Sequence, residues 1–177
     1  MTQKMTKKIW TIGHSKHSID DFLNILKFYK IECLIDVRSS LASVKDLHFT
    51  KENLKKSLLD INIEYSYSKS FVGEQRANPI SKDYLCSNNS VRDYAFYMET
   101  AQFKESLKAL EKIAVQKRTI IMCTETVWWR CHRSMISDAL KANDWTVIQI
   151  ISVNKGQEHP YTQPADIVSG KLSYKIK

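Results

Sequence analysis

The pattern of hydrophobic and polar residues along the chain predicts strands that alternate with helices. Residues 8–13 (KIWTIG) form a short apolar run, and residues 19–29 then place apolar side chains at helical spacing. Ser18, with Asp21 three positions later, is typical of a helix N-terminus. Residues 32–37 (ECLIDV) are again almost continuously apolar, as in strands that are covered on both faces. This order predicts a βαβ unit.

The alternation continues through most of the chain. We expect further helices after Thr50 and over residues 91–98, 100–115 and 134–141, and further strands over residues 63–67, 118–123 and 145–151. Residues 72–89 have no periodicity over a stretch longer than an ordinary connection, which predicts a functional loop. The tail after Val153 has no clear period either.

This pattern predicts an α/β fold, with a mostly parallel sheet flanked by helices on both faces. A chain of 177 residues with 43% hydrophobic residues suits a single domain over residues 1–177. No apolar run is long enough to cross a membrane, and residues 1–8 are polar and basic. We therefore expect a cytoplasmic protein with no membrane partner.

Composition narrows the classes of function. The four cysteines, Cys33, Cys86, Cys123 and Cys131, are too few and too scattered for a disulfide framework. The four glycines do not have the spacing of dinucleotide-binding or P-loop motifs, and no cofactor is expected. A net charge of +8 favours an anionic partner, either nucleic acid or a phosphorylated small molecule. A solvated surface rich in lysine explains this charge equally well.

Polar side chains follow three of the predicted strands: His14 with Ser15, Asp36 with Arg38, and Glu125. In parallel sheets, ligands bind outside the carboxyl ends of the strands, where these residues would lie. Two carboxylates in different surroundings can act as acid and base, so we predict His14, Asp36 and Glu125 as catalytic, with His14 orienting the carboxylates. Simple ion pairs between these carboxylates and nearby arginines are the alternative.

The segment 123–134 (CTETVWWRCHRS) is the second candidate for chemistry. Its last residues start a helix, whose free N–H groups attract an anion. The predicted phosphate-binding residues are Ser15, Arg38, Arg130, His132, Arg133 and Ser134.

The same helix start makes Cys131 a candidate nucleophile, because nearby cations and the helix dipole favour a thiolate. The loop before it contains no glycine to wrap a phosphate, so a packing role is the alternative for Cys131. Cys123, Cys131 and His132 lack the paired close spacings of structural zinc motifs, and we predict no metal site.

Several segments together resemble a known family: TIGHS (11–15), IDVRS (35–39), HF (48–49), CTE (123–125), WWRCHR (128–133) and HPYT (159–162). In this order they resemble the bacterial and archaeal family called domain of unknown function 488, over about residues 11–162, with residues 163–177 as a tail. The resemblance implies a single α/β domain and no settled activity. The chain departs from the family pattern at residues 40–47 (SLASVKDL), where a proline and arginines are usual, and at residues 72–74 (VGE), where paired glycines are usual.

The leading hypothesis from the sequence is an enzyme that acts on a nucleotide or nucleic-acid substrate by carboxylate acid/base chemistry. It would be a hydrolase or glycosidase-like enzyme on a phosphate-bearing substrate. The alternatives are a non-catalytic module that binds a nucleotide or nucleic acid, and a thiol-dependent enzyme that uses Cys131. We expect five residues to converge at the carboxyl edge of the sheet: His14, Asp36, Arg38, Glu125 and Arg133.

Overall fold

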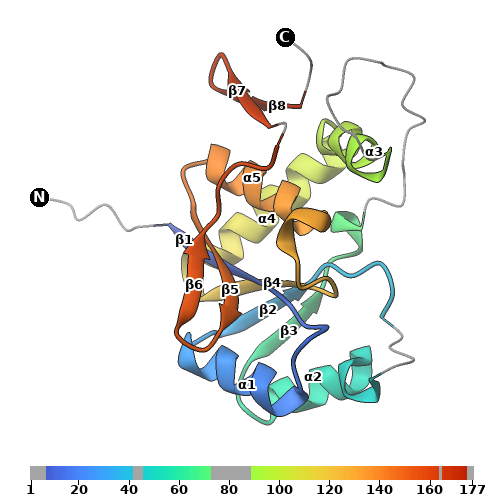
Figure 1. The fold of residues 1–177 in the computed structure, drawn as a ribbon, viewed down its shortest axis with the longest axis vertical. Helices are drawn as coiled ribbons and strands as arrows, with labels where there is room; N and C mark the ends of the chain where they lie inside the picture. The colour runs from blue at the N-terminus through green and yellow to red at the C-terminus, as the bar shows by residue number, and fades with distance from the viewer. Residues whose placement is uncertain (1–6, 42–45, 73–88, 164, 175–177) are drawn as a thin grey trace, which may run out of the picture.

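The computed structural model describes residues 7–41, 46–72, 89–163 and 165–174. Within this part of the chain, six strands form the main sheet in the order β3-β2-β4-β1-β5-β6 (Figure 1). Their bounds are β1 Lys8–Gly13, β2 Cys33–Asp36, β3 Glu64–Tyr67, β4 Thr119–Cys123, β5 Thr146–Ser152 and β6 Lys155–Glu158. The strands β1 to β5 are parallel to one another, and β6 pairs antiparallel with β5 at one edge. The predicted α/β fold with a mostly parallel sheet is confirmed.

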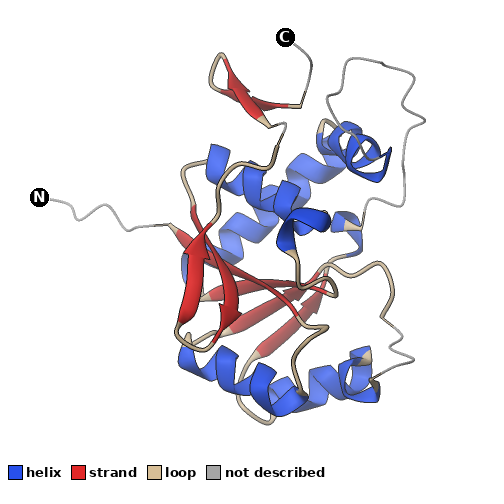
Figure 2. Ribbon diagram, viewed as in Figure 1, coloured by secondary structure: helices blue, strands red, loops and turns tan. Residues whose placement is uncertain are grey.

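Helices cover both faces of this sheet. They are α1 Ile19–Phe28, α2 Lys51–Leu59, α3 Asn89–Met98, α4 Ala101–Gln116 and α5 Arg133–Ala142, with short 3₁₀ helices η1 Leu47–Phe49, η2 Lys69–Phe71 and η3 Trp128–Arg130. Figure 2 shows α1 and α2 on one face and the other α-helices on the opposite face. None of the described helices is long and apolar enough to cross a membrane.

The helix starts follow the predicted capping residues in part. The backbone N–H of Asp21 donates to Ser18 Oγ over 3.1 Å, which caps α1 as predicted. Thr50 directly precedes α2, but its hydroxyl donates to the carbonyl oxygen of Leu47 at 2.9 Å and makes no cap to the helix. The preceding turn η1 presents that carbonyl, so the hydroxyl bonds backward along the chain.

Two hydrophobic cores lie on the two faces of the sheet. Strand β4 shows the reason, because its successive side chains point to opposite faces. Ile120 and Met122 pack in the core under α1 and α2, whereas Ile121 and Cys123 pack in the core under α4 and α5. Burial on both sides explains why the sequence of this strand is continuously apolar.

The region after Val153 contains more structure than its sequence pattern indicates. It forms β6 and a hairpin of β7 (Asp166–Val168) and β8 (Lys171–Ser173). All residues of β6 are exposed, so the strand is defined by backbone pairing with β5 and carries no apolar periodicity. The predicted functional loop lies almost wholly outside the described residues, at residues 73–88.

A buried carboxylate fastens this C-terminal region to α5. Asp138 accepts hydrogen bonds from His159 Nε2 at 2.8 Å, from the backbone N–H of Thr162 at 2.9 Å and from the Tyr174 hydroxyl at 2.6 Å. Gln149 Nε2 lies 2.9 Å from His159 Nδ1, and the His159 ring meets Trp128 edge to face at 5.0 Å. The network thus reaches the loop between β4 and α5.

Candidate functional site

The carboxyl ends of β1, β4 and β2 lie next to one another, because β4 pairs with both other strands. The backbone hydrogen bonds that join these strands continue beyond the strand ends. The backbone N–H of His14 donates to the carbonyl of Cys123 over 3.1 Å, and that of Val37 donates to the carbonyl of Met122 over 3.0 Å. The predicted site residues that follow these strands therefore share one edge of the sheet.

Gly13 allows the loop after β4 to approach β1 closely. A Cβ atom at Gly13 would lie 2.0 Å from the carbonyl oxygen of Glu125 and 2.6 Å from Cα of Thr126, which no side chain tolerates. At the same place the hydroxyls of Ser15 and Thr126 share a hydrogen bond of 2.8 Å. The glycine of the TIGHS segment is needed because the backbone after β4 packs directly against the backbone of Gly13, which leaves no room for a side chain.

Asp36 and Arg38 form a fully buried ion pair, with exposed fractions of 0% and 1%. Arg38 Nη2 donates to Asp36 Oδ2 at 2.7 Å, and Arg38 Nε donates to Oδ1 at 2.9 Å. The Tyr65 hydroxyl donates to Oδ2 at 2.8 Å, and Arg38 Nη1 donates to the carbonyl of Phe49 at 2.7 Å. Both oxygens of this carboxylate are thus engaged by the protein itself.

His14 lies above this ion pair and is neutral near pH 7. Its ring stacks on Phe49 with centroids 4.3 Å apart, and its Nε2 lies 3.5 Å from Arg38 Nη1. Burial lowers the pKa of His14 to about 4, and the charge of Arg38 adds to the shift, although the Asp36 carboxylate opposes it. A guanidinium only donates, so Nε2 accepts in this contact.

Glu125, the other predicted catalytic carboxylate, is in a different setting. Its side chain is exposed, and its Oε1 accepts a hydrogen bond of 3.3 Å from the backbone N–H of Val127 in its own loop. Asp36 is buried and paired, whereas Glu125 faces solvent. The acid/base roles of these two residues remain a prediction from the sequence.

Arg133 holds the loop after β4 in place. Its guanidinium donates to the carbonyl oxygen of Glu125, and its Nη2 donates to the carbonyl of Thr126 at 3.2 Å. The side chain is 1% exposed. Among the described residues, its Nε has no hydrogen-bond partner, so one donor of this buried, charged side chain is unpaired.

The other predicted phosphate-binding residues lie on the same loop or beside it. The Ser134 hydroxyl donates to the carbonyl of Cys131 at 2.8 Å, so it is used at the start of α5. Ser15 pairs with Thr126, and Arg130 is exposed on η3. The structure therefore gives most of the buried donors of this set partners within the protein, and within the described part of the chain the Arg130 side chain makes no hydrogen bond with the other members.

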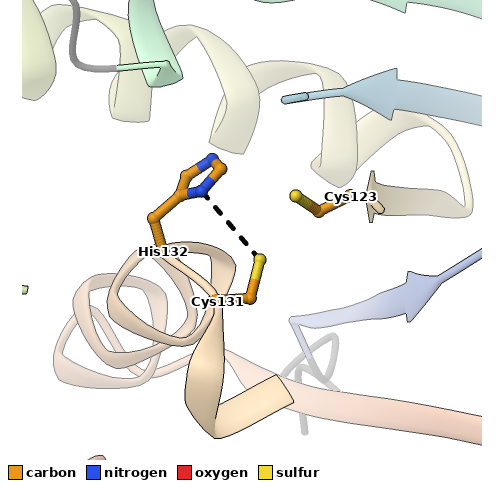
Figure 3. A group of neighbouring side chains, drawn as sticks. All are labelled: Cys123, Cys131 and His132. Atoms are coloured by element: carbon orange, nitrogen blue, oxygen red, sulfur yellow. Dashed lines mark hydrogen bonds between the residues drawn. The ribbon is translucent and has the colours of Figure 1, made fainter. Parts of the chain in front are cut away.

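Two thiols and an imidazole face one another between β4 and α5 (Figure 3). The sulfur atoms of Cys123 and Cys131 and a ring nitrogen of His132 all lie within 4.8 Å of one another. Cys131 Sγ is 3.9 Å from His132 Nδ1. His132 Nε2 is 2.9 Å from the carbonyl oxygen of Val37. A carbonyl only accepts, so Nε2 carries the proton and, in the neutral ring, Nδ1 presents its lone pair to Cys131.

The surroundings shift the pKa values of the two thiols in opposite directions. The neighbouring Cys123 thiol lowers the pKa of Cys131 well below its usual value, and His132 and Arg133 lower it further, although burial opposes them. The nearby Cys131, together with burial, raises the pKa of the Cys123 thiol. By contrast, burial raises the pKa of Cys33 to about 11. Cys131 therefore has the activated environment that reactive cysteines need.

The same three side chains offer atoms that bind zinc, namely two sulfurs and one nitrogen. The hydrogen bond from His132 Nε2 to Val37 resembles the outer contacts that orient metal-binding histidines. Three protein ligands leave a fourth position open, as in catalytic zinc sites. Sequence spacing did not indicate this cluster, because its members are brought together by the fold.

Sequence reasoning also missed the partners that fix the site. Tyr65 comes from β3 and Phe49 from η1, and neither carries a motif that points to Asp36 or His14. Cys123 was considered only as a zinc ligand, although its sulfur lies within 4.8 Å of that of Cys131. The one available signal was the position of Cys123 at the end of a predicted strand.

Comparison with known proteins identifies the family of the chain but assigns it no activity. A family model described as Domain of unknown function DUF488 matches residues 18–140. The match confirms the resemblance inferred from the sequence motifs, over a shorter range than residues 11–162. No curated protein and no solved structure matches the chain.

Proposed function

Because the chain belongs to the family of domain of unknown function DUF488, whose description assigns no activity, we propose a function from the site itself. The protein is a thiol-dependent enzyme in which Cys131 is the nucleophile. The observation that carries this proposal is the contact of 3.9 Å between Cys131 Sγ and His132 Nδ1, with the His132 ring held by the carbonyl of Val37. A nucleophile next to a base that a third group orients is the arrangement of covalent catalysis.

The geometry assigns each proton in such a reaction. His132 Nδ1 takes the proton of Cys131, which leaves a thiolate beside an imidazolium whose second N–H donates to Val37. The thiolate attacks an electrophilic atom of the substrate, the bond to the leaving group breaks, and the leaving group takes the proton from Nδ1. Water then gives a proton to Nδ1 and its oxygen displaces Cys131, which frees the enzyme.

The charges around Cys131 support an anionic substrate. Arg133 is buried, it is one of the charges that lower the pKa of Cys131, and its Nε has no partner among the described residues. The backbone N–H groups of Ser134 and Met135 at the start of α5 donate to the carbonyls of Cys131 and His132, so the charge of Arg133 is the feature that favours an anion here. We therefore retain the phosphate-bearing, nucleotide-type anion expected from the sequence as the substrate class, and we move the chemistry from the carboxylates to the thiol.

Alkylation with iodoacetamide at neutral pH tests the nucleophile. A normal thiol is only a few per cent ionised at neutral pH, so we expect Cys131 to react at least about tenfold faster than Cys33. The substitution His132→Ala should slow the alkylation of Cys131 at neutral pH, and Glu125→Gln should leave the rate of Cys131 alkylation unchanged. The position of labelling is read by peptide mass spectrometry after treatment with a chelator.

Two results would contradict the proposal. Labelling of Cys131 that is no faster than labelling of Cys33, or that does not depend on His132, would show an inert packing thiol. Labelling that requires the chelator and releases zinc would show instead that Cys123, Cys131 and His132 form a metal centre.

A further inference from the structure

We propose that Cys123 is the resolving thiol of Cys131, so that the site reduces a hydroperoxide and forms a Cys123–Cys131 disulfide. This inference rests on the proposed nucleophile and adds a second, redox activity to the same site. It is carried by the position of the two sulfur atoms, which lie within 4.8 Å of each other and face each other across the gap between β4 and α5 (Figure 3).

The backbone around the pair allows the sulfurs to meet. A disulfide needs a separation of about 2.05 Å, so the sulfurs must approach by less than about 3 Å. Cys123 is the last residue of β4, and Cys131 lies between η3 and α5 with an extended backbone. Arg133 fixes the intervening loop through the carbonyls of Glu125 and Thr126, so the two ends stay close.

The third described cysteine provides an internal contrast. Cys33 is buried in the same core as Cys123 and Cys131. It pairs in register with Thr119 at the opposite end of β4, four residues before Cys123, which corresponds to about 13 Å along the strand. A disulfide between Cys33 and either of the other two cysteines is therefore excluded while the sheet is intact.

The chemistry balances with a hydroperoxide as the oxidant. The Cys131 thiolate attacks one peroxide oxygen, the O–O bond breaks, and the departing oxygen takes the proton from His132 Nδ1 as an alcohol or water. Cys131 is then a sulfenic acid. The Cys123 thiol gives its proton to Nδ1 and attacks the Cys131 sulfur; as the S–O bond breaks, the leaving hydroxide takes that proton from Nδ1 and departs as water. The two thiols have supplied two electrons. An external dithiol then reduces the Cys123–Cys131 disulfide by thiol–disulfide exchange and restores both thiols.

The positions of the two thiols suit this order of events. Cys131 is the first nucleophile, because its sulfur lies 3.9 Å from Nδ1 of His132, the base that takes its proton. Cys123 lies on the other side of that sulfur at the end of β4, where it can attack second. Both thiols are at least nine-tenths buried. The resolving thiol thus lies within 4.8 Å of the atom that it must attack.

The test uses the full chain with Cys86→Ser in every sample, because Cys86 lies outside the described residues. Hydrogen peroxide is added in slight excess, and the products are mapped by peptide mass spectrometry with dimedone as the trap for sulfenic acid. We expect a loss of two thiols per chain, a peptide pair joined through Cys123 and Cys131, and full reversal by dithiothreitol. Adding Cys33→Ser should leave this result unchanged.

Two variants make the assignment falsifiable. Cys123→Ser should accumulate a dimedone adduct on Cys131, and Cys131→Ser should leave Cys123 reduced. The inference is overturned if the parent protein forms no joined peptide and its Cys131 is over-oxidised as fast as in Cys123→Ser. Fast alkylation of Cys131 in that same protein would leave the proposed function standing, whereas slow alkylation of Cys131 would overturn both.

Discussion

Acidification provides a quantitative test of the packing around His14. The imidazole is stacked on Phe49, it is 6% exposed, and its Nε2 accepts from the Arg38 guanidinium at 3.5 Å. A proton on this ring would place two cations in contact inside the protein. Burial, followed by the charge of Arg38, is the reason that the pKa of His14 lies near 4 in the folded chain, against an ordinary value of 6.5.

The size and sign of the effect follow from these two values. The pKa is lower in the folded state, so the stabilisation is complete above pH 6.5 and is lost as the pH falls towards 4. Between about pH 8 and about pH 5 the loss amounts to about 2 kcal/mol, because each unit of pKa difference corresponds to about 1.4 kcal/mol. For a chain of 177 residues this loss lowers the melting temperature by roughly 4–8 °C.

Thermal unfolding followed by circular dichroism at these two pH values measures the effect. The matched variant is His14→Gln, whose side-chain oxygen still accepts from Arg38 but does not titrate. All other titratable groups are common to both proteins, including His17, whose pKa is also lowered by burial. The melting temperature of the parent should therefore fall by roughly 4–8 °C more than that of the variant. Equal falls in the two proteins would refute the reasoning.

Three further substitutions test the packing of the fold around the site. Gly13→Ala should cost about 1–3 kcal/mol in thermal unfolding, because its Cβ would lie 2.0 Å from a loop carbonyl oxygen, whereas Gly156→Ala meets a side-chain atom first and should cost clearly less. Asp36→Asn should cost roughly 3–5 kcal/mol in urea unfolding, because a buried guanidinium loses its counterion. Tyr174→Phe should cost about 1–2 kcal/mol, because buried Asp138 loses a hydrogen bond of 2.6 Å. Equal losses in the two glycine variants, or a smaller loss in Asp36→Asn than in Tyr174→Phe, would contradict these expectations.

The sequence predicted those parts of the fold in which burial leaves a pattern. The apolar runs at residues 8–13 and 118–123 became central strands β1 and β4, because both faces of the sheet are covered. Strand β6 was missed because its four residues, KGQE, are all exposed and are held by backbone hydrogen bonds to β5. Backbone pairing does not depend on side-chain polarity, so such a strand cannot be predicted from the pattern of hydrophobic and polar residues.

The candidate site was predictable as an edge of the sheet but not as a set of contacts. The rule that ligands bind at the carboxyl ends of parallel strands placed His14, Asp36 and Glu125 on one edge. That rule does not say that the Arg38 side chain turns back to Asp36, or that Tyr65 reaches the same carboxylate from β3. Such contacts depend on side-chain directions and loop conformations, which one sequence does not contain.

Asp36 is connected to the thiol without touching it, through the backbone of Val37. The carboxylate holds the backbone N–H of Arg38 at 3.1 Å and so fixes the turn at residues 36–38, and the carbonyl of Val37 in that turn receives the His132 proton at 2.9 Å. If Asp36 positions His132, Asp36→Asn shifts the pH profile of Cys131 alkylation to higher pH and leaves the limiting rate at high pH intact. If Asp36 instead exchanges protons with a substrate, alkylation of Cys131 is unaffected. The pH profile of this variant, measured below its unfolding temperature, thus separates a positioning carboxylate from a catalytic one.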